Sequence, residues 1–289
     1  MVTILSTTFT MHTMKPVFST VVIVAIVSSC LIVSTPWVRG EVTTHAAAQP
    51  APARIISLIP AVSEMLFAIG AGPRVVAVSS FDDYPPEVLT LPRVGELVDP
   101  DLERILSLRP ELVIVYESQI DLRRQLDRAK IPVFVYKHAG LADITTTIRQ
   151  LGERVGQQDG AAAVIRRIEE KLRDIRMRVS GRSRPRTLVI FGRDALALRG
   201  VYASGGTGFL HDMLDAAGGD NVFADVPQQS VQATSELVLA RRPDAILELR
   251  AGAMSLAEQR KEIAVWQALP SVPAVRAGRI AIITDPRTV

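Results

Sequence analysis

The sequence predicts an α/β protein of two lobes joined by one long helix, with a ligand cleft between the lobes. Two observations predict it. From residue 54 onward, short apolar strands alternate with amphipathic helices. In addition, one helix–strand unit occurs twice in the sequence, at residues 99–115 (DPDLERILSLRPELVIV) and 234–249 (TSELVLARRPDAILEL). Glu103 of the first copy aligns with Glu236 of the second. Two copies of a unit with a helical stretch between them predict two similar lobes and a bridge.

The composition is that of a globular protein. The 289 residues are 48% apolar and 22% charged, which suffices for two lobes that each bury a core. A net charge of +3 and an aromatic content of 5% do not predict a nucleic-acid partner. The single cysteine, Cys30, excludes a disulfide framework and a thiolate metal site within one chain.

Residues 1–48 have the pattern of an export leader. Lys15 supplies positive charge ahead of residues 17–33, an unbroken run of apolar and small residues. Three endings stay open. The sequence VSSC resembles a lipoprotein box that would lipidate Cys30, cleavage could follow the AAA of residues 46–48, or the run could remain as an anchor of minimal length. The plainer alternative for Cys30 is an apolar residue of the leader.

The first lobe is predicted over residues 54–140, after a Pro/Ala tether at 49–53. Its strands are expected at 54–59, 74–79, 111–116 and 131–137, and its helices at 61–72, 99–109 and 121–130. Gly70 and Gly72 end the first of these helices, Asp99 caps the second, and Pro110 ends it. The strand at 111–116 is apolar on both faces, which is typical of a parallel sheet covered by helices.

Residues 141–180 are predicted to form the helical bridge, with one helix at 142–156 and a longer one at 159–181. Apolar residues of the longer helix fall on one stripe, namely Ala161, Val164, Ile165, Ile168, Leu172, Ile175 and Val179. The second lobe is expected over residues 181–289. Its strands are predicted at 186–191, 244–249 and 278–284, and its helices at 208–219 and 234–243.

Ligands of paired α/β lobes bind where the carboxyl ends of the strands converge. Seven residues at or beyond the ends of predicted strands are therefore candidate ligand contacts: Pro60, Tyr84, Glu96, Tyr116, Arg193, Tyr202 and Gln229. Tyr84 and Tyr202 offer a ring face and a hydroxyl to a flat ligand, and Arg193 suits a carboxylate or phosphate. In the alternative interpretation the tyrosines pack against their loops and Arg193 faces solvent.

Catalytic motifs are not found. Residues 200–209 (GVYASGGTGF) are glycine-rich but fit neither a P-loop nor a dinucleotide fingerprint, and Ser204 lacks a nucleophile elbow. Past the leader the only histidines are His138 and His211. A bare metal-ion site is therefore not predicted. His138, which follows a strand, could serve as an axial ligand to a metal already inside a bound chelate.

Six segments together resemble the periplasmic substrate-binding proteins of ABC importers for cobalamin, haem and ferric siderophores, and the cobalamin branch is the most similar. They are RIISLIPAVSEMLFAIGAG, FDDYPPE, LPRVGELVDPDLERILSLRPELVIV, YASGGTGFLHDMLDAAGGDNVFAD, TSELVLARRPDAIL and WQALPSVPAVRAGRI. The resemblance implies two Rossmann-like lobes on a rigid backbone helix and a monomeric, non-catalytic protein outside the cytoplasm. It implies no intrinsic cofactor, a corrinoid or other metal chelate as ligand, and a permease–ATPase complex of the inner membrane as partner.

The resemblance also implies a role for the repeated glutamates. In this family an acidic residue on each lobe docks to arginines of the permease, and Glu103 and Glu236 stand at the matching places. Alternatively, each glutamate only complements the positive end of its helix, a contribution of about 0.3–1 kcal/mol.

Two departures from the family pattern keep the ligand open. Cobalamin binders line the cleft with tryptophans, whereas here the matching segments read VPQQSVQA and VGELVD, and Tyr84 alone keeps a familiar aromatic. A ferric siderophore or haem is the alternative ligand, followed by a free metal ion or a cofactor-handling α/β enzyme. Family members also continue into a closing helix, whereas the sequence here stops at TDPRTV, which suggests a truncated chain or an uncovered apolar surface.

Overall fold

The first lobe is built on a parallel sheet of four strands in the order β2-β1-β3-β4. The computed structural model describes residues 50–137 and 140–284, and residues 49–289 cluster as one unit. The strands are β1 (Ile55–Ser57), β2 (Val75–Val78), β3 (Leu112–Tyr116) and β4 (Val133–Tyr136). Residues 112–115 of β3 are all buried, as expected for a strand that helices cover on both faces.

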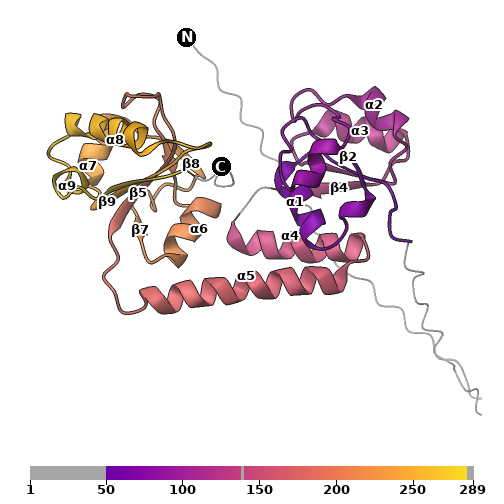
Figure 1. Ribbon diagram of the computed structural model, residues 1–289, viewed down its shortest axis with the longest axis horizontal. Coiled ribbons are helices and arrows are strands. Elements are labelled where there is room, and N and C mark those ends of the chain that lie inside the picture. The colour runs from indigo at the N-terminus through magenta and orange to yellow at the C-terminus, as the bar shows by residue number, and fades with distance from the viewer. Residues whose placement is uncertain (1–49, 138–139, 285–289) are drawn as a thin grey trace, which may run out of the picture. The chain divides into compact units, whose positions relative to one another are not determined.

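Helices lie on both faces of this sheet (Figure 1). They are α1 (Pro60–Ala68), η1 (Gly72–Arg74), η2 (Pro86–Thr90), α2 (Leu102–Ser107) and α3 (Ile120–Arg128). Alternate residues of a strand point to opposite faces. Ile55 accordingly joins the core that contains α1, whereas Ile56 joins the core that contains α2 and α3.

The bridge consists of α4 (Leu141–Arg154) and α5 (Gln158–Val179), which lie side by side in Figure 1. Close approach depends on Gly152, because a Cβ there would lie 2.5 Å from the Cβ of Ala161. The predicted stripe of α5 divides into two parts. Its first four members, up to Ile168, pack into the first-lobe core, while its last three are half-buried and Val179 lies against Gly218 of the second lobe.

The sheet of the second lobe is mixed, with the order β10-β9-β5-β6-β8 and β7 beside β5. Its strands are β5 (Arg186–Gly192), β6 (Tyr202–Ser204), β7 (Asp220–Asn221), β8 (Ser230–Gln232), β9 (Ala245–Leu249) and β10 (Ile280–Ile283). Its helices are α6 (Phe209–Ala216), α7 (Ser235–Arg241), α8 (Leu256–Ala264), η3 (Val265–Ala268) and α9 (Pro273–Arg276). β5, β9 and β10 are parallel, whereas β6 and β8 run antiparallel and were not predicted.

The repeat seen in the sequence is also a repeat of geometry. Arg109 after α2 and Arg242 after α7 both adopt a left-handed backbone, with φ of 46° and 49°. Gly70 and Gly218 end α1 and α6 at φ of 91° and 79°. One detail of the prediction is wrong: the N-cap of α2 is Asp101, which accepts from the Arg104 amide at 2.9 Å, and not Asp99.

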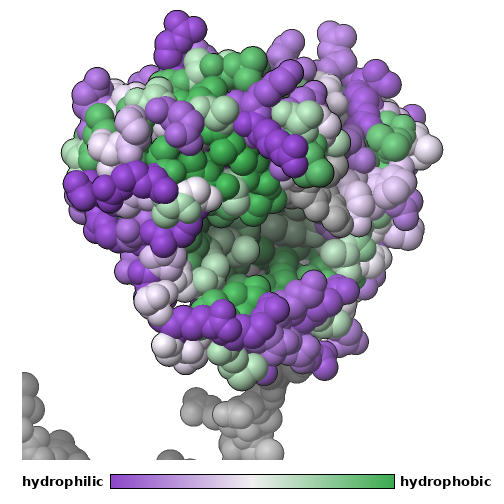
Figure 2. Space-filling model, turned by 60° about the vertical axis from the view of Figure 1, so that its left-hand side comes forward, coloured by the Kyte–Doolittle hydropathy of each residue, from purple (hydrophilic) through white to green (hydrophobic). Residues whose placement is uncertain are grey.

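On the face that Figure 2 shows, hydrophilic side chains cover much of the surface and hydrophobic residues gather around a hollow. Among the described residues no helix has the length and apolar character needed to cross a membrane. The predicted leader with Cys30, the last five residues, and His138 lie outside the described residues.

Candidate ligand-binding pocket

A pocket of about 1160 Å³ is lined by elements of both lobes and the bridge. The first lobe contributes α1, the loop before η2, and the last residues of β3 and β4, Tyr116 and Tyr136. The second contributes the start of α6 and the carboxyl ends of β5 and β9. The pocket therefore lies where the strands of both sheets end, as expected for paired α/β lobes.

Aromatic side chains form much of its wall. The chain has four tyrosines, and three of them line the pocket: Tyr84, Tyr116 and Tyr136. The rings of Tyr116 and Tyr136 meet edge to face, with centroids 5.7 Å apart. Burial raises the pKa of both phenols above the ordinary value of 10.0. These rings offer flat apolar surface and hydroxyl groups to a ligand.

Tyr84 is presented by a loop that hydrogen bonds hold in shape. Arg93 donates from Nη1 to the carbonyls of Ser79 and Asp82 at 2.9 and 2.7 Å. Asp82 in turn accepts from the backbone amide of Ser79 at 3.0 Å. A cis peptide bond joins Tyr84 to Pro85. The loop thus places a 44% exposed tyrosine ring at the pocket without a helix or strand beneath it.

Four of the seven predicted ligand contacts line this pocket: Pro60, Tyr84, Tyr116 and Gln229. Tyr202 is not among the lining residues; its ring packs against the lining residue Phe191, with centroids 6.4 Å apart, and is 46% exposed. Glu96 is also absent from the lining; its backbone amide donates to the Asp99 carbonyl.

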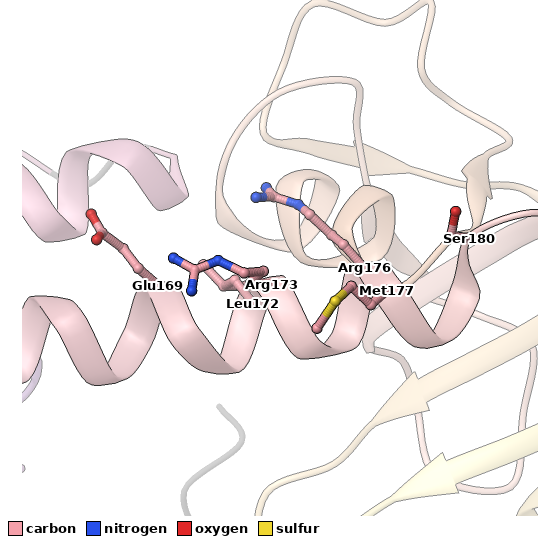
Figure 3. Close-up of a pocket in the computed structure, with 6 residues that line it drawn as sticks. All are labelled: Glu169, Leu172, Arg173, Arg176, Met177 and Ser180. Atoms are coloured by element: carbon pink, nitrogen blue, oxygen red, sulfur yellow. The ribbon is translucent and has the colours of Figure 1, made fainter.

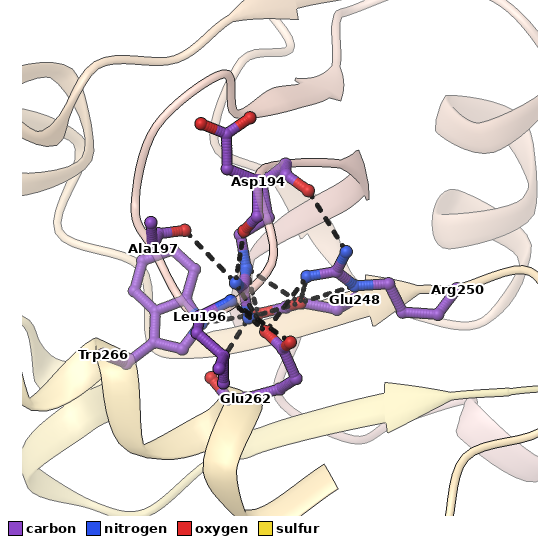
Figure 4. Close-up of polar contacts among 8 residues, drawn as sticks. Asp194, Leu196, Ala197, Glu248, Arg250, Glu262 and Trp266 are labelled. Atoms are coloured by element: carbon purple, nitrogen blue, oxygen red, sulfur yellow. Dashed lines mark hydrogen bonds and ion pairs between the residues drawn. The ribbon is translucent and has the colours of Figure 1, made fainter. Parts of the chain in front are cut away.

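Arg193 neither faces the pocket nor solvent, contrary to both interpretations of the sequence. Its side chain is fully buried, 3.0 Å from Glu248 and 2.7 Å from Glu262. Arg250 approaches the same two carboxylates, and the indole of Trp266 donates to Glu248 at 2.6 Å (Figure 4). With its guanidinium taken up by these groups, Arg193 holds the ends of β5 and β9 to α8.

Several lining residues were not predicted, among them Glu64, Glu87, Tyr136, Phe191 and Phe209. Tyr136 and Phe191 lie inside the predicted strands at 131–137 and 186–191, and Tyr116 was the one candidate taken from inside a predicted strand. Phe209 is the first residue of α6, and Glu64 lies one turn into α1. Including strand-final residues and the first turns of the helices that follow would have found them.

Two further depressions lie on the part of the surface that the structure describes. A depression of about 520 Å³ is lined by residues of α5 and the adjoining Ser180 alone, including Glu169, Arg173 and Met177 (Figure 3). Another, of about 450 Å³, lies over β5, β9 and β10. Within residues 50–137 and 140–284, no group of three His, Cys, Asp or Glu side chains could hold a metal ion.

The repeated glutamates lie away from the pocket wall, each exposed in the first turn of its short helix. Thr234, the N-cap of α7, accepts from the Leu237 amide at 3.3 Å. The pKa of the Glu236 carboxyl is lowered by a hydrogen bond from its own backbone and by one from Thr234. One turn beyond each glutamate stands a leucine, Leu106 or Leu239, which is 39% or 38% exposed.

Comparison with known proteins places this architecture in a family. Residues 55–286 match the family model described as periplasmic binding protein. The chain belongs to this family. Members are binding proteins, so the prediction of a non-catalytic α/β protein is confirmed.

Individual relatives are named for two kinds of ligand. The vitamin B12-binding protein of Salmonella typhimurium is 32% identical over 228 residues, 77% of this chain and 80% of that protein. The periplasmic vitamin B12-binding protein of Vibrio cholerae aligns at a TM-score of 0.68 and 24% identity, over 81% of this chain and 88% of that one. A periplasmic haem-binding protein of Pseudomonas aeruginosa aligns at 0.67 and 23% identity, over 81% and 85%. The latter two show the fold alone.

Proposed function

We propose that this protein is the substrate-binding component of an ABC importer and that it carries a corrinoid, a cobalamin-like metal chelate. The observation that carries the proposal is the aromatic-lined pocket at the strand ends of both lobes. Its volume of about 1160 Å³ exceeds the roughly 300–1,000 Å³ of pockets for drug-sized ligands. A large, flat cargo fits such a pocket better than a bare ion, and the B12-binding relative at 32% identity supports the same class.

Haem or a ferric siderophore is the second candidate. The structural likeness to a haem-binding protein and the absence of tryptophan from the described pocket wall favour it. His138 follows β4, whose last residue Tyr136 lines the pocket, so it remains our candidate for an axial ligand of the cargo metal.

Delivery would use the two exposed glutamates. Glu103 and Glu236 occupy equivalent places on α2 and α7, and each is accompanied by a partly exposed leucine one turn later. Two copies of one carboxylate-plus-leucine surface suit a two-point contact with a permease bearing arginines. The pattern of residues 1–48 supports export of the protein from the cytoplasm, and Cys30 is the candidate lipidation site.

A titration with visible detection tests the proposed cargo. Cobalamin, haemin and a ferric siderophore each have their own chromophore, and the purified protein should change the spectrum of cobalamin on binding. Tyr84→Ala should weaken binding by about tenfold, since an aromatic stacking contact is worth about 1–3 kcal/mol. The matched control is Tyr202→Ala, because this similarly exposed ring is not part of the wall. No spectral change with any of the three ligands would overturn the proposal.

A further inference from the structure

Positive charge is concentrated where the bridge meets the second lobe, in the basic segment of residues 171–182. Five cationic side chains stand there beside one carboxylate, Asp174, which gives the segment a net charge of +4. The cations are Lys171, Arg173, Arg176, Arg178 and Arg182. The whole chain carries only +3, so all its other residues together carry −1. The excess positive charge of the protein therefore lies in this one segment.

The cations of the basic segment are exposed and are not paired within the protein. All five side chains are exposed, and none of them belongs to the ion pairs found among the described residues. By contrast Arg184, just beyond the segment, lies 2.6 Å from Asp215 and 2.7 Å from Asp220. The five cations are therefore available to an anionic partner outside the chain.

The helix dipole explains only part of this charge. Arg176 and Arg178 lie in the last turn of α5, where cations complement the negative end of the helix. That effect falls off within one turn, so it does not extend to Lys171 and Arg173. Arg173 and Arg176 are also three residues apart, a spacing at which like charges destabilise a helix. An anion bound beside them would remove this repulsion.

The surface around these arginines combines charge with apolar side chains. Arg173 and Arg176 line the depression of about 520 Å³ on α5 together with Leu172 and Met177, and Glu169 is its one carboxylate (Figure 3). Met177 is 62% exposed. Clusters of Lys and Arg on an amphipathic helix are typical of surfaces that contact anionic lipids, and an exposed apolar side chain among them can enter the headgroup layer.

We propose that the basic segment is a membrane-contact surface, which binds the anionic phosphate headgroups of phospholipids. Members of the family are periplasmic binding proteins, and the permease proposed as partner lies in a membrane, so such headgroups are within reach. A bilayer also offers an apolar phase to Met177, which an acidic protein surface does not. No residue of the basic segment lines the ligand pocket, so the proposed contact is independent of the cargo.

Partitioning of the full chain into lipid vesicles tests this contact. Vesicles of phosphatidylcholine alone are compared with vesicles containing about 30% phosphatidylglycerol, at a fixed low salt concentration. The leader is present in every variant and contributes equally to both partition coefficients, so their ratio reports the contribution of charge. The wild type should favour the anionic vesicles at least about thirtyfold, since each cation at such a surface contributes about fivefold. Arg173→Gln with Arg176→Gln should lower the ratio at least about tenfold.

The matched control is Arg124→Gln with Arg128→Gln, which removes the same charge from two exposed positions of α3. It should keep the ratio within about twofold of wild type, because charges that do not touch the bilayer are screened. If the wild type does not distinguish the two kinds of vesicle, or if both double variants lose binding equally, the membrane contact is wrong. Cobalamin binding by the same proteins is measured separately, so this failure leaves the proposed function intact.

Polyglutamate, at the same concentration of negative charge, is the comparison ligand for an acidic protein. It should bind the wild type more weakly than the anionic vesicles do, because it has no apolar phase for Met177. If polyglutamate binds as tightly as these vesicles and loses as much affinity in Arg173→Gln with Arg176→Gln, the basic segment fits an acidic protein. The proposed contact with a membrane is then overturned.

Discussion

Arg193 and Glu248 form an ion pair inside the second lobe, with Nη2 and Oε2 3.0 Å apart and neither side chain reached by solvent. Two pocket-lining residues lie close by: Phe191 is in β5, two residues before Arg193, and Leu249 follows Glu248 in β9. The pair therefore supports the second-lobe wall of the pocket from behind. A buried pair holds its charges only while both partners are present.

Removing Arg193 should destabilise the protein strongly. In Arg193→Met the carboxylates of Glu248 and Glu262 lose their main partner, with Arg250 left to pair both. The expected loss in free energy of unfolding is about 3–5 kcal/mol, measured by guanidinium denaturation. Arg199→Met is the control, since the exposed pair of Arg199 with Asp194 at 3.5 Å should contribute less than about 1 kcal/mol. Equal losses in the two variants would show that burial does not govern the effect.

Asp82 lies in the loop that carries Tyr84, and its carboxyl makes the stability of the folded protein depend on pH. Desolvation raises the pKa of its buried carboxyl above 3.8, and Oδ1 has no hydrogen-bond partner. A raised folded-state pKa means that the folded form binds the proton more tightly than the unfolded chain. The favourable contribution is therefore present below pH 3.8 and is lost as pH rises through the raised pKa.

Asp82→Asn removes this titration, so the variant should gain stability relative to wild type as pH rises from about 3 to 6. Any cost of the unpaired amide is the same at each pH and drops out of the comparison. Denaturation midpoints of both proteins across this range measure the change. A stability difference that is flat with pH would count against the assignment. Asp83→Asn, at an exposed neighbour, controls for loss of charge in the loop.

Local and repeated features could be predicted from the sequence. Helices α1 and α6 end at Gly70 and Gly218. Both glycines have a left-handed backbone conformation, which few other residues adopt. Apolar runs such as residues 112–115 located the parallel strands because burial on both faces leaves no polar position. Two residues of the pocket wall, Pro60 and Tyr116, were found by their place at the ends of strands β1 and β3.

Long-range pairing could not be predicted. Arg193 lies 55 residues from Glu248 and finds it only when β5 and β9 align. A carboxylate within the apolar strand at 244–249 was a signal that a buried cation was needed, but the sequence did not say which one. Strands β6 and β8 are three residues each, and β8 contains Ser230 and Gln232, so no hydrophobic period marks them.

Asp212 of α6 connects the second lobe to the bridge. Its Oδ2 accepts from the backbone amide of Leu141, the first residue of α4, at 2.7 Å. The buried side of α4, with Ile148 and Leu151, belongs to the first-lobe core. This hydrogen bond therefore links the second lobe to a helix that packs on the first, and we expect it to contribute to the arrangement that forms the pocket. Asp212→Ala should weaken cobalamin binding about fivefold, the equivalent of about 1 kcal/mol.

Asp143→Ala provides the matched comparison. Asp143 also accepts at the start of α4, from the Gly140 amide at 3.0 Å, but it belongs to α4 itself. Its loss should lower the free energy of unfolding by about 1 kcal/mol, as for other helix caps, with ligand affinity unchanged. The two variants together separate a weakened helix from a weakened contact between lobes. If both reduce affinity equally, Asp212 acts only as a cap.

The docking proposal predicts a transport defect without a binding defect. Glu103→Lys with Glu236→Lys reverses the charge at both equivalent points, where arginines of a permease would then be repelled. Uptake into vesicles containing the permease and ATPase should fall to background, while the affinity for cobalamin stays within about twofold because neither glutamate lines the pocket. Each single reversal should leave partial uptake, since one contact point remains.

Glu170→Lys serves as the control for this pair, because it adds the same charge at an exposed position of α5. Full uptake by the control with none by the double variant would assign the defect to α2 and α7. Leu106→Ala and Leu239→Ala extend the test to the partly exposed leucines, which should reduce uptake together if the surface acts as one patch on each lobe. If uptake survives the double charge reversal, the docking proposal is wrong. The two glutamates then act only as first-turn charges on their helices, and delivery depends on another surface.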